Sequence, residues 1–274
     1  MTTTHVTGRT RDLVIGMDKL ILTFSRHWLL VVNVMAGLFI GLTVVAPLLM
    51  ALGLEGPARV LYRFYALNCH QLPQRSYFLF GPRGVDTYSL EQILAWGADP
   101  GYLRGFVGNA EVGFKMAMAH RNTAIYTGVF LAGLGYALLR RRLRALSWKW
   151  YLILIAPMFF DGVSHIISEV TGLGFRGTNT WAVWLTGGVF GPAFYTGMGI
   201  GSLNWLLRTL TGALFGLASV WLAYPLLEAG LADIRQQLER QLVRAGVLGS
   251  KTGVRRPWKL GAPHPGEYTG NEPS

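Results

Sequence analysis

The chain has 274 residues, of which 51% are hydrophobic and only 14% charged, and its mean hydropathy is +0.34. Soluble domains carry about 25% charged residues, so the composition excludes an ordinary soluble enzyme, a disordered chain and a coiled coil, and favours a polytopic membrane protein. The net charge of +11 does not indicate nucleic acid, because the cations flank apolar runs, where they report topology and contact with the lipid bilayer.

The first apolar run predicts a transmembrane helix at about residues 28–54, without a single charged residue. It is too long for the apolar core of a signal peptide and lacks a convincing cleavage site, so we expect it to be retained. Before it, residues 13–24 place apolar side chains around Asp18 and Lys19. This pattern predicts a short amphipathic helix on the membrane surface, within an N-terminal segment of residues 1–27.

Residues 55–111 are more polar and predict an extramembrane loop of about 55 residues. A helix is expected from Ala58 to about Cys69, with Pro73 ending it. Ser89 marks a second helix start further along.

Two more spans are expected at about residues 114–139 and 150–170. Five cations lie in the short connection between them: Arg140, Arg141, Arg142, Arg144 and Lys149. Such a cluster is a strong positive-inside signal. It predicts that this loop and the N-terminus are cytoplasmic, in the plasma membrane, and that residues 55–111 lie outside.

The next two apolar blocks leave the span count open. Residues 203–227 predict a fourth span, whereas residues 173–202 are too rich in glycine for a straight helix. We interpret residues 173–202 as a re-entrant or interfacial segment, tolerated at membrane depth when protein covers it. Five spans, with residues 181–201 crossing, is the alternative.

The expected fold is therefore all-α, a polytopic membrane domain of residues 28–227 with four transmembrane helices. Residues 228–274 begin as an amphipathic helix with an apolar stripe that suits a membrane surface or another subunit. They end in a flexible tail rich in proline, glycine and charge. Four spans place this C-terminal segment in the cytoplasm.

The third span contains three ionisable side chains four residues apart, Asp161, His165 and Glu169, near one helix face. Ionisable groups inside a span are costly and mark a functional site or a buried pair. Two interpretations stay open. One is a ligand, proton or metal site; the other is ion pairing with a cation on another span, with Glu169 at the outer water interface.

Arg208, one turn into the last span, is the expected salt-bridge partner of Asp161 or Glu169, and anion binding is the alternative for this residue. Arg121, beside His120 at the start of the second span, is a second candidate. Because the starts of the second and fourth spans and the end of the third are expected at the outer face, we expect one polar pocket. Its residues are Asp161, His165, Arg208, Arg121 and Glu169.

Cys69 and His70 form a second candidate site. Cysteine beside histidine suits metal or redox chemistry, with His120 as a further candidate ligand, but one such pair is a weak signal. The alternative is a buried thiol beside a hydrogen-bonded histidine. The cysteine count is one, so no intramolecular disulfide forms.

Four motifs resemble a bacterial and archaeal family of membrane proteins catalogued as domain of unknown function 2085. They are Cys69-His70-Gln71-x-Pro73-x-Arg75-Ser76, Arg121-x-x-Ala124-Ile125-Tyr126, Asp161-Gly162 and Arg208-Thr209-x-Thr211-Gly212. The resemblance covers about residues 60–228 and implies a multi-span α-helical membrane protein without a known activity. Family members often carry two cysteines where this chain has Ala119 and Asn122, which weakens the metal hypothesis.

The favoured function is a non-enzymatic membrane protein, transporter-like or an accessory subunit of a larger assembly. Its polar pocket would hold a small anion, a quinone or lipid headgroup, or a structural ion pair. The alternative is a membrane enzyme acting on a lipid-like or quinone substrate, with Cys69, His70, His120 and His165 at the outer face, either with or without a metal. A third hypothesis is a pigment- or cofactor-bearing subunit with His165 as axial ligand. The cofactor is unknown.

Overall fold

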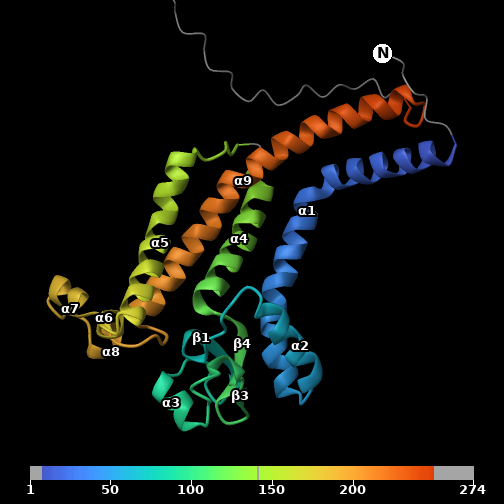
Figure 1. Cartoon of the computed structure of the whole chain (residues 1–274). Coiled ribbons are helices and arrows are strands. Elements are labelled where there is room, and N and C mark those ends of the chain that lie inside the picture. The colour runs from blue at the N-terminus through green and yellow to red at the C-terminus, as the bar shows by residue number, and fades with distance from the viewer. Residues whose placement is uncertain (1–7, 141, 250–274) are drawn as a thin grey trace, which may run out of the picture.

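The computed structural model describes residues 8–140 and 142–249. Within them, four helices are long and apolar enough to cross a membrane: α1 (Arg9–Ala51), α4 (His120–Leu139), α5 (Trp148–Val170) and α9 (Leu203–Arg244). These helices run side by side (Figure 1), and most of their apolar side chains stay exposed on the outside of the bundle. The expected all-α polytopic fold with four spans is confirmed. The tail expected to be flexible, residues 250–274, lies outside the described residues, as do residues 1–7.

Glycine residues at the contact between α4 and α9 let the two helices pack closely against each other. A Cβ at Gly212 would lie 2.8 Å from the carbonyl oxygen of Arg121, and one at Gly128 would lie 2.8 Å from that of Ala213. A Cβ at Gly216 would overlap the carbonyl oxygen of Ile125. Gly212 and Gly216 are four residues apart on one face of α9, the spacing that lets membrane helices approach closely.

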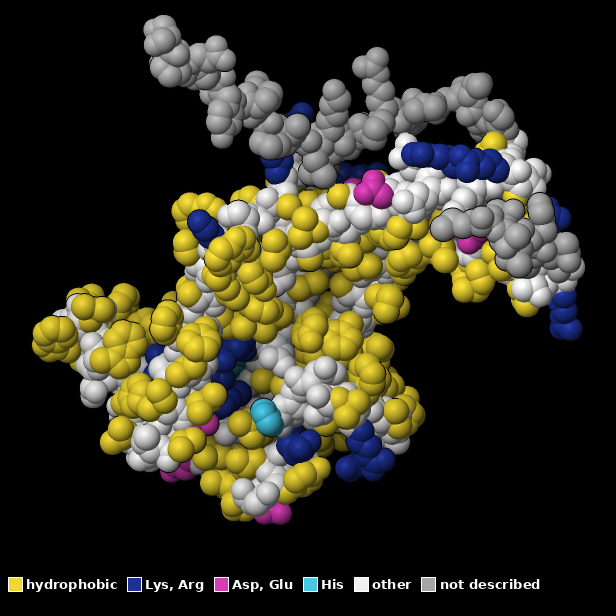
Figure 2. Space-filling model, turned by 45° about the horizontal axis from the view of Figure 1, so that its top comes forward, with side chains coloured by type: hydrophobic (Ala, Val, Ile, Leu, Met, Phe, Trp, Pro, Cys, Tyr) yellow, Lys and Arg dark blue, Asp and Glu magenta, His cyan; other side chains and the backbone are white. Residues whose placement is uncertain are grey.

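Both terminal helices continue beyond the bundle as amphipathic arms, residues 9–27 of α1 and residues 226–244 of α9. The arms lie along each other (Figure 1), with Leu22 packed against Leu238 and Leu242. Arg26 pairs with Glu239 at 2.7 Å. The two amphipathic segments expected from the sequence are therefore continuous with their spans and pack on each other. Figure 2 shows apolar side chains along the lower side of the arms and charged ones above.

Residues 55–119 form a small module that connects α1 to α4. It comprises α2 (Glu55–Tyr65), η1 (Pro73–Arg75), β1 (Ser76–Gly81), β2 (Gly84–Asp86), α3 (Leu90–Ala95), η2 (Leu103–Gly105), β3 (Gly108–Asn109) and β4 (Gly113–Ala119). The strands make an antiparallel sheet in the order β2-β1-β4-β3. Phe78, Tyr88 and Ile93 are the centre of its apolar core. The expected helix start at Ser89 is confirmed by a capping box with Gln92.

Two expected boundaries in this region are wrong. Residues 114–119 belong to strand β4, which directly precedes α4, and are not the start of a span. They pair with β1 and β3 in the sheet. The first helix of the module ends at Tyr65, earlier than Cys69, because the N–H groups of Leu67 and Asn68 donate to carbonyl oxygens three residues back and not four.

Residues 173–202 hold three short helices, α6 (Phe175–Thr178), α7 (Thr180–Thr186) and α8 (Pro192–Tyr195). None has the length of a span, which favours four spans over five. Buried amides satisfy the irregular backbone: Asn179 Nδ2 donates to the carbonyl oxygens of Arg176 (3.1 Å) and Tyr195 (2.7 Å), and Asn204 Nδ2 to those of Arg176 (2.6 Å) and Gly197 (2.8 Å).

The segments outside the four spans lie at the two ends of the bundle (Figure 1). The start of α1, the end of α9 and the connection between α4 and α5 lie at one end. The sheet module and helices α6 to α8 lie at the other. This arrangement brings the start of α4, the end of α5 and the start of α9 to the same end.

Candidate functional site

Asp161 is the centre of a buried cluster of ionisable side chains between α4, α5 and α9. Its carboxylate forms ion pairs with Arg121, from the first turn of α4, and with Arg176, from α6. The Nε2 atom of His165, one turn further along α5, lies 3.0 Å from Nη2 of Arg176 and 3.8 Å from the carboxylate. Asp161, His165 and Arg176 are each less than a tenth exposed.

Arg208 completes the cluster from the start of α9. It is 5% exposed and close enough to Asp161 and to Arg75, Arg121 and Arg176 to interact with their charges. However, its guanidinium makes no ion pair or hydrogen bond with any residue of the two described ranges. The interpretation of Arg208 as the salt-bridge partner of Asp161 or Glu169 is therefore wrong.

Glu169 pairs instead with Arg75, at the rim of the cluster. Arg75 belongs to η1 of the sheet module, and its side chain is 17% exposed, against 53% for Glu169. Burial and the nearby Arg121 lower the pKa of Arg75, whereas Asp161 raises it. Glu169 thus lies at the exposed edge of the cluster, and its position at an outer water interface stays a prediction.

The four arginines, which we call the arginine cluster, are Arg75, Arg121, Arg176 and Arg208. Two carboxylates, Asp161 and Glu169, lie among them. The cluster therefore carries two more positive charges than negative ones, the histidines aside. Buried charge of one sign is costly unless it is paired, so this arrangement favours a bound anion.

Arg176 and Arg75 are the two members of the cluster that sequence reasoning missed, and Arg176 contacts Asp161 directly. The backbone N–H of Arg176 donates to Ser168 Oγ at 3.0 Å, and its carbonyl oxygen accepts from Asn179 and Asn204. These contacts fold residues 173–202 back onto α5. The sequence did contain an indication that Arg176 is functional or paired, because it is the one charged residue in the apolar, glycine-rich segment 173–202.

A groove of about 480 Å³ opens beside the cluster between α5, α6, α7 and α9. Asp161, Ser164 and Arg176 lie at its polar end. Its other lining residues are mostly apolar: Pro157, Phe160, Phe175, Trp181, Leu207 and Thr211. The groove therefore extends from an apolar surface of the bundle to the buried side chains of Asp161 and Arg176.

In the Cys-His-Gln segment, Gln71 has a structural role: its side chain links two elements of the sheet module. Gln71 is 2% exposed, and its Nε2 donates to the carbonyl oxygens of Tyr62 (2.7 Å) and Ala117 (2.9 Å), which joins α2 to β4. Lys115, fully buried, donates through Nζ to the carbonyl oxygens of Gln71 (3.0 Å) and Arg104 (2.6 Å).

The candidate metal ligands are only partly brought together. Cys69 Sγ accepts the backbone N–H of Ala119 at 3.4 Å, and His120 follows directly but packs its buried ring on Tyr77. His70 is exposed. Within the described residues, no group of three or more histidine, cysteine or acidic side chains is arranged to hold a metal ion.

Lys115 should make the stability of the sheet module depend on pH. Burial lowers the pKa of Lys115 to about 7; Cys69 opposes this shift and Arg104 adds to it. Between about pH 7 and pH 9.5 the unfolded chain binds the proton that the folded one has lost, so the free energy of unfolding rises with pH, by up to about 1 kcal/mol per unit. Melting of the detergent-solubilised protein, followed by tryptophan fluorescence, measures this slope.

The Lys115→Met variant should lose that slope, whereas Lys149→Met, which removes an exposed lysine, should keep it. An equal slope in both variants would contradict the assignment.

Four membrane-length helices around a buried charge cluster define a polytopic α-helical membrane protein. A family model described as "Predicted membrane protein (DUF2085)" matches residues 111–196, which confirms the resemblance noted above. An uncharacterized protein of the archaeon Methanocaldococcus jannaschii is 31% identical over 109 residues, 39% of this chain, and the match spans about half (49%) of that relative's length. No solved structure matches the chain.

Proposed function

We propose that this protein is a non-enzymatic integral membrane protein, transporter-like or an accessory component of a larger assembly, that binds a phosphate-type anion at the arginine cluster. The carrying observation is Arg208, a buried guanidinium without an ion pair in the described part of the chain. A buried cation of this kind is costly by itself and stable once an anion reaches it.

The chemistry of the cluster selects the ligand. Guanidinium groups match phosphate oxygens in a planar, two-pronged geometry, with hydrogen bonds strengthened by charge. A phosphate dianion would neutralise the two excess positive charges. The phosphate would be either a free ion or the headgroup of a lipid, and the apolar groove beside Asp161 and Arg176 supports the lipid-borne form.

The expected topology places this site at the outer end of the bundle. The connection between α4 and α5 lies at the end opposite to the cluster. Because its sequence is rich in cations, the positive-inside rule assigns that end, with both termini, to the cytoplasm. In a plasma membrane, the cluster would then face the extracellular side. The amphipathic arms and the exposed apolar residues of α7, such as Trp184 and Leu185, would provide docking surfaces for other subunits.

The Arg208→Gln variant tests the proposal. Without ligand it should be at least as stable as the wild type, because an unpaired buried charge is removed. Inorganic phosphate in hundredfold excess over its Kd should stabilise the wild type by about 2.7 kcal/mol, and Arg208→Gln should lose this effect. The measurement is the apparent melting temperature in detergent, with sulfate and chloride at equal ionic strength for comparison.

The matched control is Arg63→Gln, which removes an exposed charge from α2 at the same end of the protein. It should keep the phosphate response. A short-chain phosphatidic acid distinguishes the two sources: stabilisation by it alone indicates a lipid headgroup, and stabilisation by phosphate as well indicates a free ion. No response to either ligand, or an unchanged response in Arg208→Gln, would contradict the proposal.

A further inference from the structure

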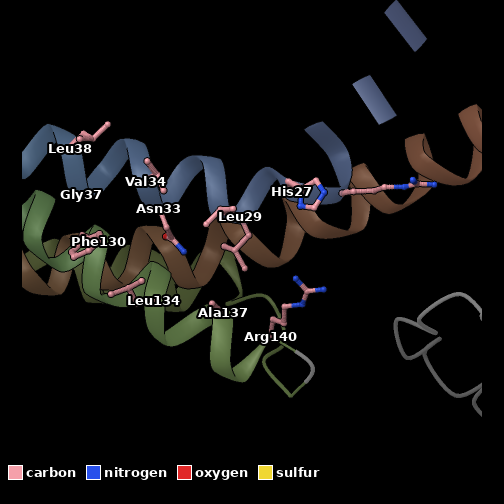
Figure 3. A pocket seen from close by; sticks show the side chains of 12 residues that line it. His27, Leu29, Asn33, Val34, Gly37, Leu38, Phe130, Leu134, Ala137 and Arg140 are labelled. Carbon is pink, nitrogen blue, oxygen red and sulfur yellow. The ribbon is translucent and has the colours of Figure 1, made fainter. Parts of the chain in front are cut away.

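A second groove lies at the opposite end of the bundle, between α1 and α4, with a volume of about 620 Å³. We call it the α1–α4 groove. Its walls are mainly apolar: Leu29, Leu30, Val34, Gly37, Leu38, Phe130, Leu134 and Ala137. Figure 3 shows Leu38 and Phe130 at one end of it and His27 and Arg140 at the other. Arg26 also lines the groove.

We propose that the α1–α4 groove binds one acyl chain of an anionic phospholipid, whose phosphate lies between Arg140 and Arg26. This site is separate from the arginine cluster and does not depend on it.

The dimensions of the groove fit a lipid of one leaflet. Its lining on α1 runs from Arg26 to Leu38. Twelve residues of helix rise about 18 Å, and one leaflet of hydrocarbon is about 15 Å thick, half of the bilayer core. A chain in the groove therefore reaches from the headgroups to the middle of the membrane.

The walls of the groove offer an occupant mainly apolar packing contacts. Leu30, Val34 and Leu38 are half or more exposed, so the groove opens directly to the surrounding lipid. Asn33 also lines the groove but is 6% exposed; its Nδ2 donates to the carbonyl oxygen of Gly133 at 3.1 Å, and its Oδ1 is buried without a hydrogen-bond partner among the described residues.

The charged end selects the headgroup. Arg26 is paired with Glu239, whereas Arg140 is exposed and has no ion pair within residues 8–140 and 142–249. Arg142 and Arg144 follow in the adjoining loop. The end of the groove therefore carries excess positive charge at headgroup depth, which attracts an anionic headgroup and has no preference for a zwitterionic one.

The test is lipid titration of the delipidated, detergent-purified full chain, followed by native mass spectrometry. Phosphatidylglycerol and phosphatidylcholine with the same acyl chains are compared. We expect one phosphatidylglycerol to bind before any phosphatidylcholine. Arg140→Gln should weaken that first binding event about tenfold, the loss of one charge-assisted hydrogen bond.

Arg144→Gln is the matched control, because it removes the same charge from the same loop but does not line the groove. It should change the affinity less than about twofold. Val34→Trp, which fills the groove without changing charge, should weaken the binding of phosphatidylglycerol as strongly as Arg140→Gln.

Three outcomes would overturn the proposal. The first is equal binding of the two lipids by the wild type, a comparison that needs no variant to fold. The second is equal weakening by Arg140→Gln and Arg144→Gln, which would indicate diffuse attraction to the loop. The third is a first lipid lost from Arg208→Gln but retained by Arg140→Gln, which would place it at the arginine cluster.

Discussion

Replacing Asp161 with asparagine should destabilise the protein by about 3 kcal/mol or more. The substitution keeps the size of the side chain but leaves Arg121 and Arg176 without the carboxylate that both contact. Breaking a buried ion pair on one side costs about 3–5 kcal/mol, because the remaining charge stays buried and unpaired. The apparent melting temperature in detergent, read by tryptophan fluorescence, measures the loss.

The matched control is Glu55→Gln, which breaks an exposed pair with Arg59. Pairs of this kind contribute between about 0 and 1 kcal/mol, so this variant should melt close to the wild type. Inorganic phosphate should restore part of the stability of Asp161→Asn, since an anion can replace the lost carboxylate. A variant as stable as the wild type would show that the two arginines do not need Asp161.

The second large effect is expected at Gly216, where α9 touches α4. In the Gly216→Leu variant a side chain would have to occupy space held by the backbone at Ile125 and Gly128. Overpacking of this kind costs typically about 1–3 kcal/mol and sometimes more, and here it separates the two helices that carry Arg121 and Arg208. We expect a loss of about 3 kcal/mol, together with loss of the phosphate response.

Gly230 provides the control on the same helix, because a Cβ there meets no atom within 4 Å. Gly230→Leu should be neutral or slightly stabilising, since leucine favours helix more than glycine does. Size-exclusion profiles and melting temperatures of the two variants make the comparison. Equal behaviour of both would mean that close contact between α4 and α9 is not required for folding.

Much of the charge cluster was predictable from spacing alone. Asp161 and His165 lie one helical turn apart, and alternating spans bring the starts of α4 and α9 to the end of α5. These rules suffice to place Arg121 and Arg208 near Asp161, as the structure shows. These rules do not predict which side chains form ion pairs. Ion pairing depends on how far each side chain reaches and on the conformation of loops, and the sequence of a loop has no periodic pattern that predicts its conformation.

Arg75 and Arg176 show this limit. Both come from irregular segments, η1 and α6, whose positions follow from contacts made over long sequence distances. Arg176 reaches Asp161 because Ser168, Asn179 and Asn204 hold its backbone. Strand β4 shows a related limit: an apolar run next to a span does not distinguish strand from helix by periodicity, and pairing with β1 decides it.

The sequence by itself determined the class of protein, the apolar runs that form its spans and the helix faces that carry ionisable groups, because hydrophobic length and helical spacing are local properties. Only the tertiary structure decided that Arg121 and Arg176 neutralise Asp161, and that Arg208 stays without a partner among the described residues. The reason is physical: the energy of a buried charge depends on which groups surround it in space, and those groups come from five separate elements of the fold.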